Sequence, residues 1–176
     1  IPSSADFIFD YGDGSTPDTN VIKPHLYKIP ATHPDDSIIF YPSLLADSFG
    51  CNALFQDTII VYRSPKVDFT IDSSVGCQPF DVVMLNATDK FNNVSWDLYN
   101  DGVYDDFDDT MALTLDTSGI FSVRLRADYI GGCFTELTRD SFVAVIDTPV
   151  AGFTMDITQG CNSLTVNFKN TTSPAF

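Results

Sequence analysis

The densest group of metal-ligand side chains lies between residues 97 and 109. Five of them could bind calcium together: Asp97, Asn100, Asp101, Asp105 and Asp106. Calcium takes about six to eight oxygen ligands, which closely spaced carboxylates and carbonyls supply. Tyr99 stands where a calcium loop has a ligand, and no glutamate closes the loop. A turn in which aspartates cap backbone N–H groups explains the same residues, so both interpretations stay open.

Catalytic side chains are scarce. The chain has only two histidines, His25 and His33, and no Ser–His–Asp or Cys–His set can be assembled around them. It has no phosphate-binding loop and no zinc spacing among its cysteines. The sequence therefore predicts a protein that is not an enzyme and that requires no cofactor, with calcium as the one candidate ion.

Composition narrows the classes of partner and of fold. The chain has 176 residues, with 24 acids against 9 bases and a net charge of −15. This charge argues against nucleic acid and anionic membranes as partners, because both are polyanions. No apolar run approaches the length of a membrane span, which predicts no membrane insertion. All acids but Glu136 are aspartates, and a chain rich in Asp, Thr, Val and Phe favours strands and turns.

An internal repeat sets the expected organisation. Residues 67–89 align without a gap to residues 151–173, an offset of 84, and a period of this length suits a β-sandwich domain. We expect residues 1–64 to be the back part of a first repeat, 65–148 a complete repeat, and 149–176 the opening of a third. The prolines Pro65 and Pro149 mark the two joints.

Alternation within the complete repeat predicts its strands and its core. Val94, Trp96 and Leu98 share one face of a strand, and Phe121, Val123 and Leu125 share one face of another. Such period-2 patterns, with turn signals every 8–12 residues or so, are typical of an antiparallel sandwich. The fold class is therefore all-β, and Trp96 is expected in the core. The same alternation predicts that Arg124 and Arg126 point to water.

An ordered set of motifs resembles the polycystic-kidney-disease (PKD) repeat, an immunoglobulin-like β-sandwich. The family's aromatic–Asp–aromatic–Gly–Asp–Gly element matches Phe9, Asp10 and the residues up to Gly14, and Trp96 and Asp97 match it more loosely. Its His-x-Tyr element matches His25 and Tyr27, which implies a structural role for that histidine. The Gly–Cys pairs resemble the version in large secreted proteins of gliding bacteria. The resemblance implies tandem spacer or interaction modules, without catalysis, in an extracellular or cell-surface protein.

The four cysteines, Cys51, Cys77, Cys133 and Cys161, suggest an oxidising compartment. Cys77 and Cys133 share one repeat and form the simplest pair. In a sandwich, however, the first and last loops fall at opposite ends, and a strand of eight residues spans about 26 Å, against about 5.5 Å between disulfide Cα atoms. This favours bridges between neighbouring repeats, with partners outside these residues, and both pairings stay open.

Two functions follow as alternatives. The first is a non-catalytic spacer in an adhesin or surface filament, whose partners are neighbouring repeats of the same chain. The second is a calcium-dependent module that binds a glycan or a surface protein, with Tyr99, Tyr104 and Phe107 stacking on the sugar. Three Asp–Ser/Thr–aliphatic triplets resemble an O-glycosylation signal of bacterial secreted proteins, with acceptors at Ser37, Thr58 and Thr110.

Overall fold

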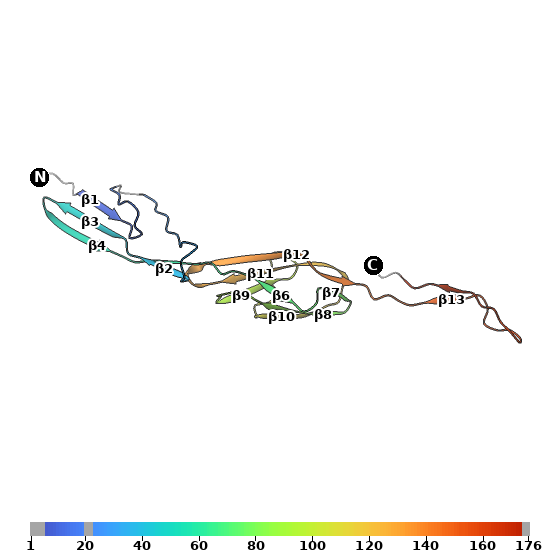
Figure 1. Ribbon diagram of the computed structural model, residues 1–176. Helices are drawn as coiled ribbons and strands as arrows, with labels where there is room; N and C mark the ends of the chain where they lie inside the picture. The colour runs from blue at the N-terminus through green and yellow to red at the C-terminus, as the bar shows by residue number, and fades with distance from the viewer. Residues whose placement is uncertain (1–5, 20–22, 174–176) are drawn as a thin grey trace. The chain divides into compact units, whose positions relative to one another are not determined.

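The computed structural model describes residues 6–19 and 23–173, and these residues form an all-β protein (Figure 1). The described part of the chain has several antiparallel sheets and one short 3₁₀ helix, η1 (Ile130–Gly132). None of its helices is long and apolar enough to cross a membrane. It divides into two compact units. The first covers residues up to Ser64 together with Tyr129–Cys133, and the second covers Pro65–Asp128 and the residues from Phe134 onward.

The first unit is built from five strands. They are β1 (Asp6–Asp10), β2 (Ser37–Phe40), β3 (Ser43–Ser48), β4 (Cys51–Gln56) and β5 (Ile59–Tyr62). β3 pairs with β1 and with β4, and β2 pairs with β5, all antiparallel. β4 is exposed along its whole length. Among the described residues of this unit, Phe40 is the only buried hydrophobic side chain, so this layer of strands is covered far less than a sandwich core requires.

The second unit contains two facing sheets. One has the order β10 (Thr110–Leu115), β8 (Phe80–Asn86), β6 (Phe69–Ile71). The other has the order β7 (Val75–Cys77), β12 (Phe134–Ile146), β11 (Gly119–Asp128), β9 (Asn93–Asp97). All pairs are antiparallel except β7 with β12, which run parallel. Short strands with one apolar face bury that face against a second sheet, and this packing produces the sandwich that alternation predicts.

The core of the second unit confirms the alternation. Trp96 is completely buried, together with Val123 and Leu125, and Phe121 packs against them from a partly buried position. Phe69 crosses from the other sheet, with its ring edge-on to Trp96 at 5.3 Å between centroids. The Trp96 indole donates a hydrogen bond to the carbonyl of Asp108 at 2.8 Å. The buried ring is thus satisfied both in packing and in hydrogen bonding.

The last described segment repeats a local structure found 84 residues earlier. β13 (Phe153–Met155) pairs with β14 (Phe168–Asn170), and Phe153 faces Asn170 as Phe69 faces Asn86. The hydrogen bonds match as well. The N–H of Thr172 donates to the side chain of Asn170 at 2.9 Å, and the N–H of Thr88 donates to Asn86 at 2.9 Å. The gap-free alignment therefore corresponds to one shared backbone arrangement.

A proline explains the one irregular alignment position. Aligning Ala46 with Ala127 puts Pro42 opposite Val123, which lies in a strand. The proline lies between two strands, because β2 ends at Phe40 and β3 begins at Ser43. In the second unit β11 runs through, but its register against β12 shifts between Phe121 and Val123. A proline lacks the N–H that a ladder needs, so it sits where the repeat already has an irregularity.

Candidate functional site

The acidic turn after β9 is organised around Asp97. This side chain is fully buried. Its Oδ1 accepts the N–H of Asp101 at 3.1 Å, and its Oδ2 accepts the N–H of Gly102 at 2.9 Å. Arg124 of β11 donates to the same Oδ2 at 2.6 Å. Asp97 therefore holds the turn closed and forms an ion pair, so both of its oxygens already have donors.

The ionised state of Asp97 is favoured despite its burial. Burial opposes charge on this carboxyl, but the N–H groups of Gly102 and Asp101 and the guanidinium of Arg124 outweigh it. Together they hold the pKa of Asp97 below its usual range. Hydrogen bonds to a charged carboxylate stabilise that form, so Asp97 stays negative and paired wherever the native fold persists near neutral pH.

The three other aspartates among the predicted calcium ligands also accept hydrogen bonds from the backbone. Asp101 accepts the N–H of Val103 at 2.8 Å, and Asp105 accepts the N–H of Leu98 at 2.8 Å. Asp106 accepts two N–H groups, from Phe107 at 2.6 Å and from Asp108 at 2.9 Å. Asn100 has a positive φ of 53° and is exposed, as suits a turn residue. These side chains surround one turn, and one oxygen of each of the three carboxylates is directed to an amide.

This arrangement favours the turn-capping interpretation over the calcium one. A cation would have to replace several amide donors and lie beside the Arg124 guanidinium, which repels it. Within residues 6–19 and 23–173, no group of three or more His, Cys, Asp or Glu side chains is arranged to hold a metal ion. Asp, Asn and Gly serve equally as calcium ligands and as turn residues, and only the direction of the oxygens separates the two roles.

A cluster of paired charges around Arg124 and Arg126 of β11 is a feature that alternation alone does not predict. Arg126 binds Asp128 with its guanidinium at 2.7 Å and lies 4.0 Å from the centre of the Phe134 ring. Glu136, the only glutamate, lies 3.5 Å from Arg126 and accepts the hydroxyl of Tyr104 at 3.1 Å. Arg124 and Arg126 are thus partly covered, which corrects the expectation that they simply point to water. The sequence signal that could have indicated this cluster is the presence of two arginines in one strand together with the only glutamate of the chain.

The three aromatic side chains of the glycan hypothesis are placed differently from one another. Tyr104 is partly covered and hydrogen-bonded, and burial together with Glu136 raises its pKa. Tyr99 packs edge-on against Phe121, with ring centroids 5.7 Å apart, and remains half exposed. Phe107 is exposed. Among the described ring contacts none joins two of the three, so they do not form a common stacking platform.

The matching element of the first unit has its own turn. Phe9 of β1 is half-buried and lies opposite Leu44, as Trp96 lies opposite Leu125. Asp10 accepts the N–H of Gly12 at 2.8 Å. His25 stacks on Tyr11 at 3.8 Å and contacts Asp13 at 2.8 Å. His25 thus packs and hydrogen-bonds within the first unit, and Asp10 caps one amide of its turn, without the burial and the arginine partner of Asp97.

The four cysteines lie at strand ends and turns, and all are free thiols. Cys51 begins β4, Cys77 ends β7, and Cys161 lies in the segment between β13 and β14. Cys77 lies opposite Ile146 at the end of β12, whereas Cys133 directly precedes its start. Since a strand rises about 3.3 Å per residue, the 13 residues of β12 separate them far beyond disulfide reach. Pairing of Cys77 with Cys133 inside one chain is therefore incompatible with this fold.

The predicted glycosylation acceptors lie at the starts of strands or between strands. Ser37 begins β2 and is partly covered, Thr58 lies exposed between β4 and β5, and Thr110 begins β10 and is exposed. Thr58 and Thr110 are therefore accessible in this fold.

The comparisons with known proteins leave the chain without an identified family. No family model matches it, and no curated protein matches it. The PKD-type assignment therefore stays a hypothesis, and the local geometry has to carry the functional argument.

Proposed function

We propose that this chain is a stretch of non-catalytic spacer repeats, of the PKD-like immunoglobulin type, in a large extracellular or cell-surface protein such as an adhesin or surface filament. The observation that carries the proposal is the recurrence of one backbone arrangement at an offset of 84. The pairs Phe69–Asn86 and Phe153–Asn170 share their register. Their side-chain caps recur at the same offset, which favours modules of one design placed in series.

Two further features support a spacer role. The polar clusters are used internally: the acidic turn caps its own amides, and Arg124 is paired with Asp97. The buried core cluster of the second unit also lies entirely within residues 69 to 145, as suits a module with a core of its own. A module that is self-sufficient and carries no convergent polar site suits a structural role better than a catalytic one.

Small-angle scattering from tandem copies of residues 65–148 tests the proposal. One, two and three copies joined through the native proline joint should increase in maximum dimension by the same increment per copy, because a stiff series of modules extends linearly. A maximum dimension that barely grows from two to three copies would show collapse of the modules onto one another and would contradict a spacer.

The calcium-dependent binding module is the second candidate, and it has a direct test. Glycan-array binding of the 176-residue chain, with and without chelator, should show no calcium-dependent signal if the acidic turn serves only as a cap. Calcium-dependent capture of one glycan class would favour the binding module instead.

A further inference from the structure

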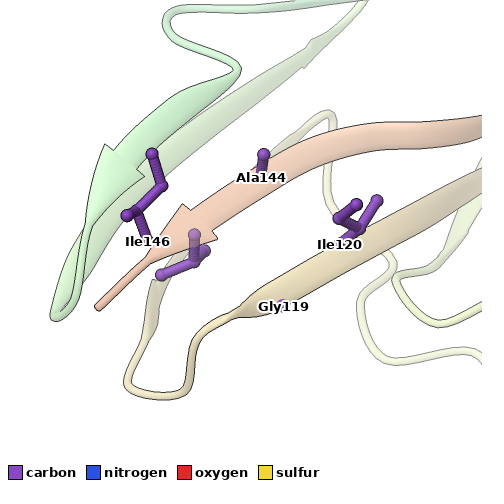
Figure 2. A pocket seen from close by; sticks show the side chains of 5 residues that line it. Gly119, Ile120, Ala144 and Ile146 are labelled. Carbon is purple, nitrogen blue, oxygen red and sulfur yellow. The ribbon is translucent and has the colours of Figure 1, made fainter. Parts of the chain in front are cut away.

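A shallow apolar cavity lies at one end of the second unit, outside the core. Its volume is about 260 Å³, and its lining is formed by Gly119, Ile120, Ala144, Val145 and Ile146. Figure 2 shows that these residues come from two neighbouring strands, β11 and β12. Ile120 and Ala144 are paired directly across the strands. Ile120, the second residue of β11, is 70% exposed, which is high for an isoleucine that is paired in a strand.

Cys77 borders this cavity. β7 adds to β12 in parallel, so that Val75 lies beside Ala144 and Cys77 beside Ile146. Cys77 is exposed, and Val75 is 54% exposed. An accessible thiol thus stands at the rim of an uncovered apolar patch. We call Ile120, Ala144, Ile146 and Cys77 the end patch.

The first unit contains an equivalent of the end patch. Ile39 corresponds to Ile120 in the repeat, at the offset that aligns Ala46 with Ala127. Ile39 pairs with Ile60 as Ile120 pairs with Ala144. Continuing two residues along each strand makes Tyr62 the counterpart of Ile146, at the same offset of 84 that relates Pro65 to Pro149.

In the first unit a turn contacts Tyr62, the counterpart of Ile146, while Ile39 and Ile60 remain 47% and 45% exposed. The turn Tyr129–Cys133, which joins β11 to β12, belongs to the first unit. The thiol of Cys133 lies 3.7 Å from the carbonyl oxygen of Tyr62. Gly131 has a φ of +71°, and a Cβ there would come within 2.4 Å of the Tyr62 ring. The turn therefore approaches as closely as only a glycine permits, and it brings a cysteine to the residue that corresponds to the neighbour of Cys77.

We propose that the end patch is a docking site for the Gly–Gly–Cys turn of another copy of the repeat, and that Cys77 forms a disulfide with the cysteine of that turn. The inference rests on the proposed spacer function and names its partner. In the first unit the turn contacts the counterpart of Ile146. In the second unit Ile146 lies beside Cys77, and the patch is uncovered.

The covalent step needs an oxidant of the disulfide class, such as glutathione disulfide. The turn cysteine first becomes a mixed disulfide with glutathione. The thiolate of Cys77 then attacks the turn sulfur, the new S–S bond forms, and glutathione leaves as a thiolate. Overall two thiols lose two protons and two electrons, and one glutathione disulfide becomes two glutathiones.

The test presents the turn to the reduced 176-residue chain. A backbone-cyclised peptide with the sequence of residues 124–138 carries its cysteine as the glutathione mixed disulfide, and peptide mapping follows which cysteine takes it up. Docking raises the local concentration of the reacting groups, so we expect Cys77 to react about tenfold faster than the exposed Cys161. In about 6 M urea, which unfolds the chain, this preference should vanish.

Matched variants separate docking from ordinary reactivity. Ile120→Asp places a charge in the patch and should remove the preference for Cys77. Leu85→Asp changes an exposed leucine of β8 on the other sheet and should leave the preference intact. A peptide in which the residue equivalent to Gly131 is valine should also lose the preference. A serine version of the peptide should still shift the methyl resonances of Ile120 and Ile146 without forming a bond.

Equal uptake at Cys51, Cys77 and Cys161, or a preference for Cys77 that survives Ile120→Asp, would overturn the docking proposal. Such a result would leave the spacer function untouched, because that function is decided by the scattering of tandem copies. A failure of linear extension together with selective uptake at Cys77 would contradict the spacer function and support the docking of the turn.

Discussion

Strands that the sequence alignment predicts to correspond lie in different surroundings in the two units. In the second unit β11 and β12 run uninterrupted for 10 and 13 residues, and a second sheet covers their inner face. In the first unit the counterparts are broken into β2 with β3 and β4 with β5, and Phe55 of β4 is 66% exposed. Strands therefore pair in both units, whereas among the described residues a large hydrophobic core between two sheets, the main source of stability in such a fold, is present only in the second unit.

The largest expected effect comes from removing the central ring of the covered unit. Trp96→Ala should lower the free energy of unfolding by roughly 3–5 kcal/mol, because it leaves a large cavity in a closed core. Urea unfolding followed by circular dichroism, with hydrogen exchange to resolve the two units, measures it. The matched control is Phe9→Ala in the first unit, where half-burial predicts a loss nearer 1 kcal/mol or so. Equal losses at the two positions would remove the distinction between the units.

A smaller loss is expected from the buried carboxylate. Asp97→Asn keeps the shape but weakens three hydrogen bonds to a charged acceptor, which should reduce the free energy of unfolding by about 2 kcal/mol. The control is the exposed Asp10→Asn, whose effect should be within about 0.5 kcal/mol. A variant at Asp97 as stable as the control would show that the ion pair with Arg124 contributes little.

The same carboxylate predicts a dependence on pH. The pKa of Asp97 in the folded state lies below its ordinary value, so its contribution is fully present above the unfolded-state pKa of about 4 and is lost as the pH falls through the folded-state pKa. Between pH 7 and 5 the difference in stability between wild type and Asp97→Asn should stay constant, and below about pH 4 it should shrink. Urea titrations at each pH measure it, and a difference that grows on acidification would contradict the assignment.

The break at Pro42 allows a finer test. Pro42→Val introduces the residue type of the second unit and restores an N–H, so β2 and β3 should join. We expect a stability change below about 1 kcal/mol, with slower amide exchange at residues 41–44. Val123→Pro, the reverse change, should be destabilising because it removes a ladder bond within the covered sheet. Unchanged exchange after Pro42→Val would show that something other than the proline maintains the break.

The smallest effect is expected from calcium. Because the carboxylates of the acidic turn already accept amide N–H groups, melting curves of the chain in millimolar calcium and in chelator should coincide. A ligand that binds only the native state would raise the melting temperature by mass action. Such a rise, abolished by Asp101→Asn, would restore the calcium interpretation.

Sequence patterns were informative wherever a rule of geometry applied. Alternation identified Trp96, Val123 and Leu125 as one buried face, since successive side chains in a strand point to opposite sides. The aligned residues 67–89 and 151–173 share one local pairing, in which Phe153 lies opposite Asn170 as Phe69 lies opposite Asn86. Alternation describes a single strand, so it could not show which other segment covers an outward side chain. Arg124 is an example, since Tyr104 contacts it from a loop. Nor could composition separate a capped turn from a calcium loop, because that depends on where each oxygen points.

The parallel pairing of β7 with β12 has a mechanical consequence. β7 lies near the start of the second unit and β12 near the end of its sandwich, and Ser74, Gln78, Ala144 and Ile146 exchange backbone hydrogen bonds there. Tension applied through the two ends of the module pulls these parallel strands in opposite directions along their length. The hydrogen bonds between β7 and β12 then bear the load together, whereas those of a hairpin pulled apart from its open end break one after another. The module therefore resists stretching most strongly where its chain enters and leaves.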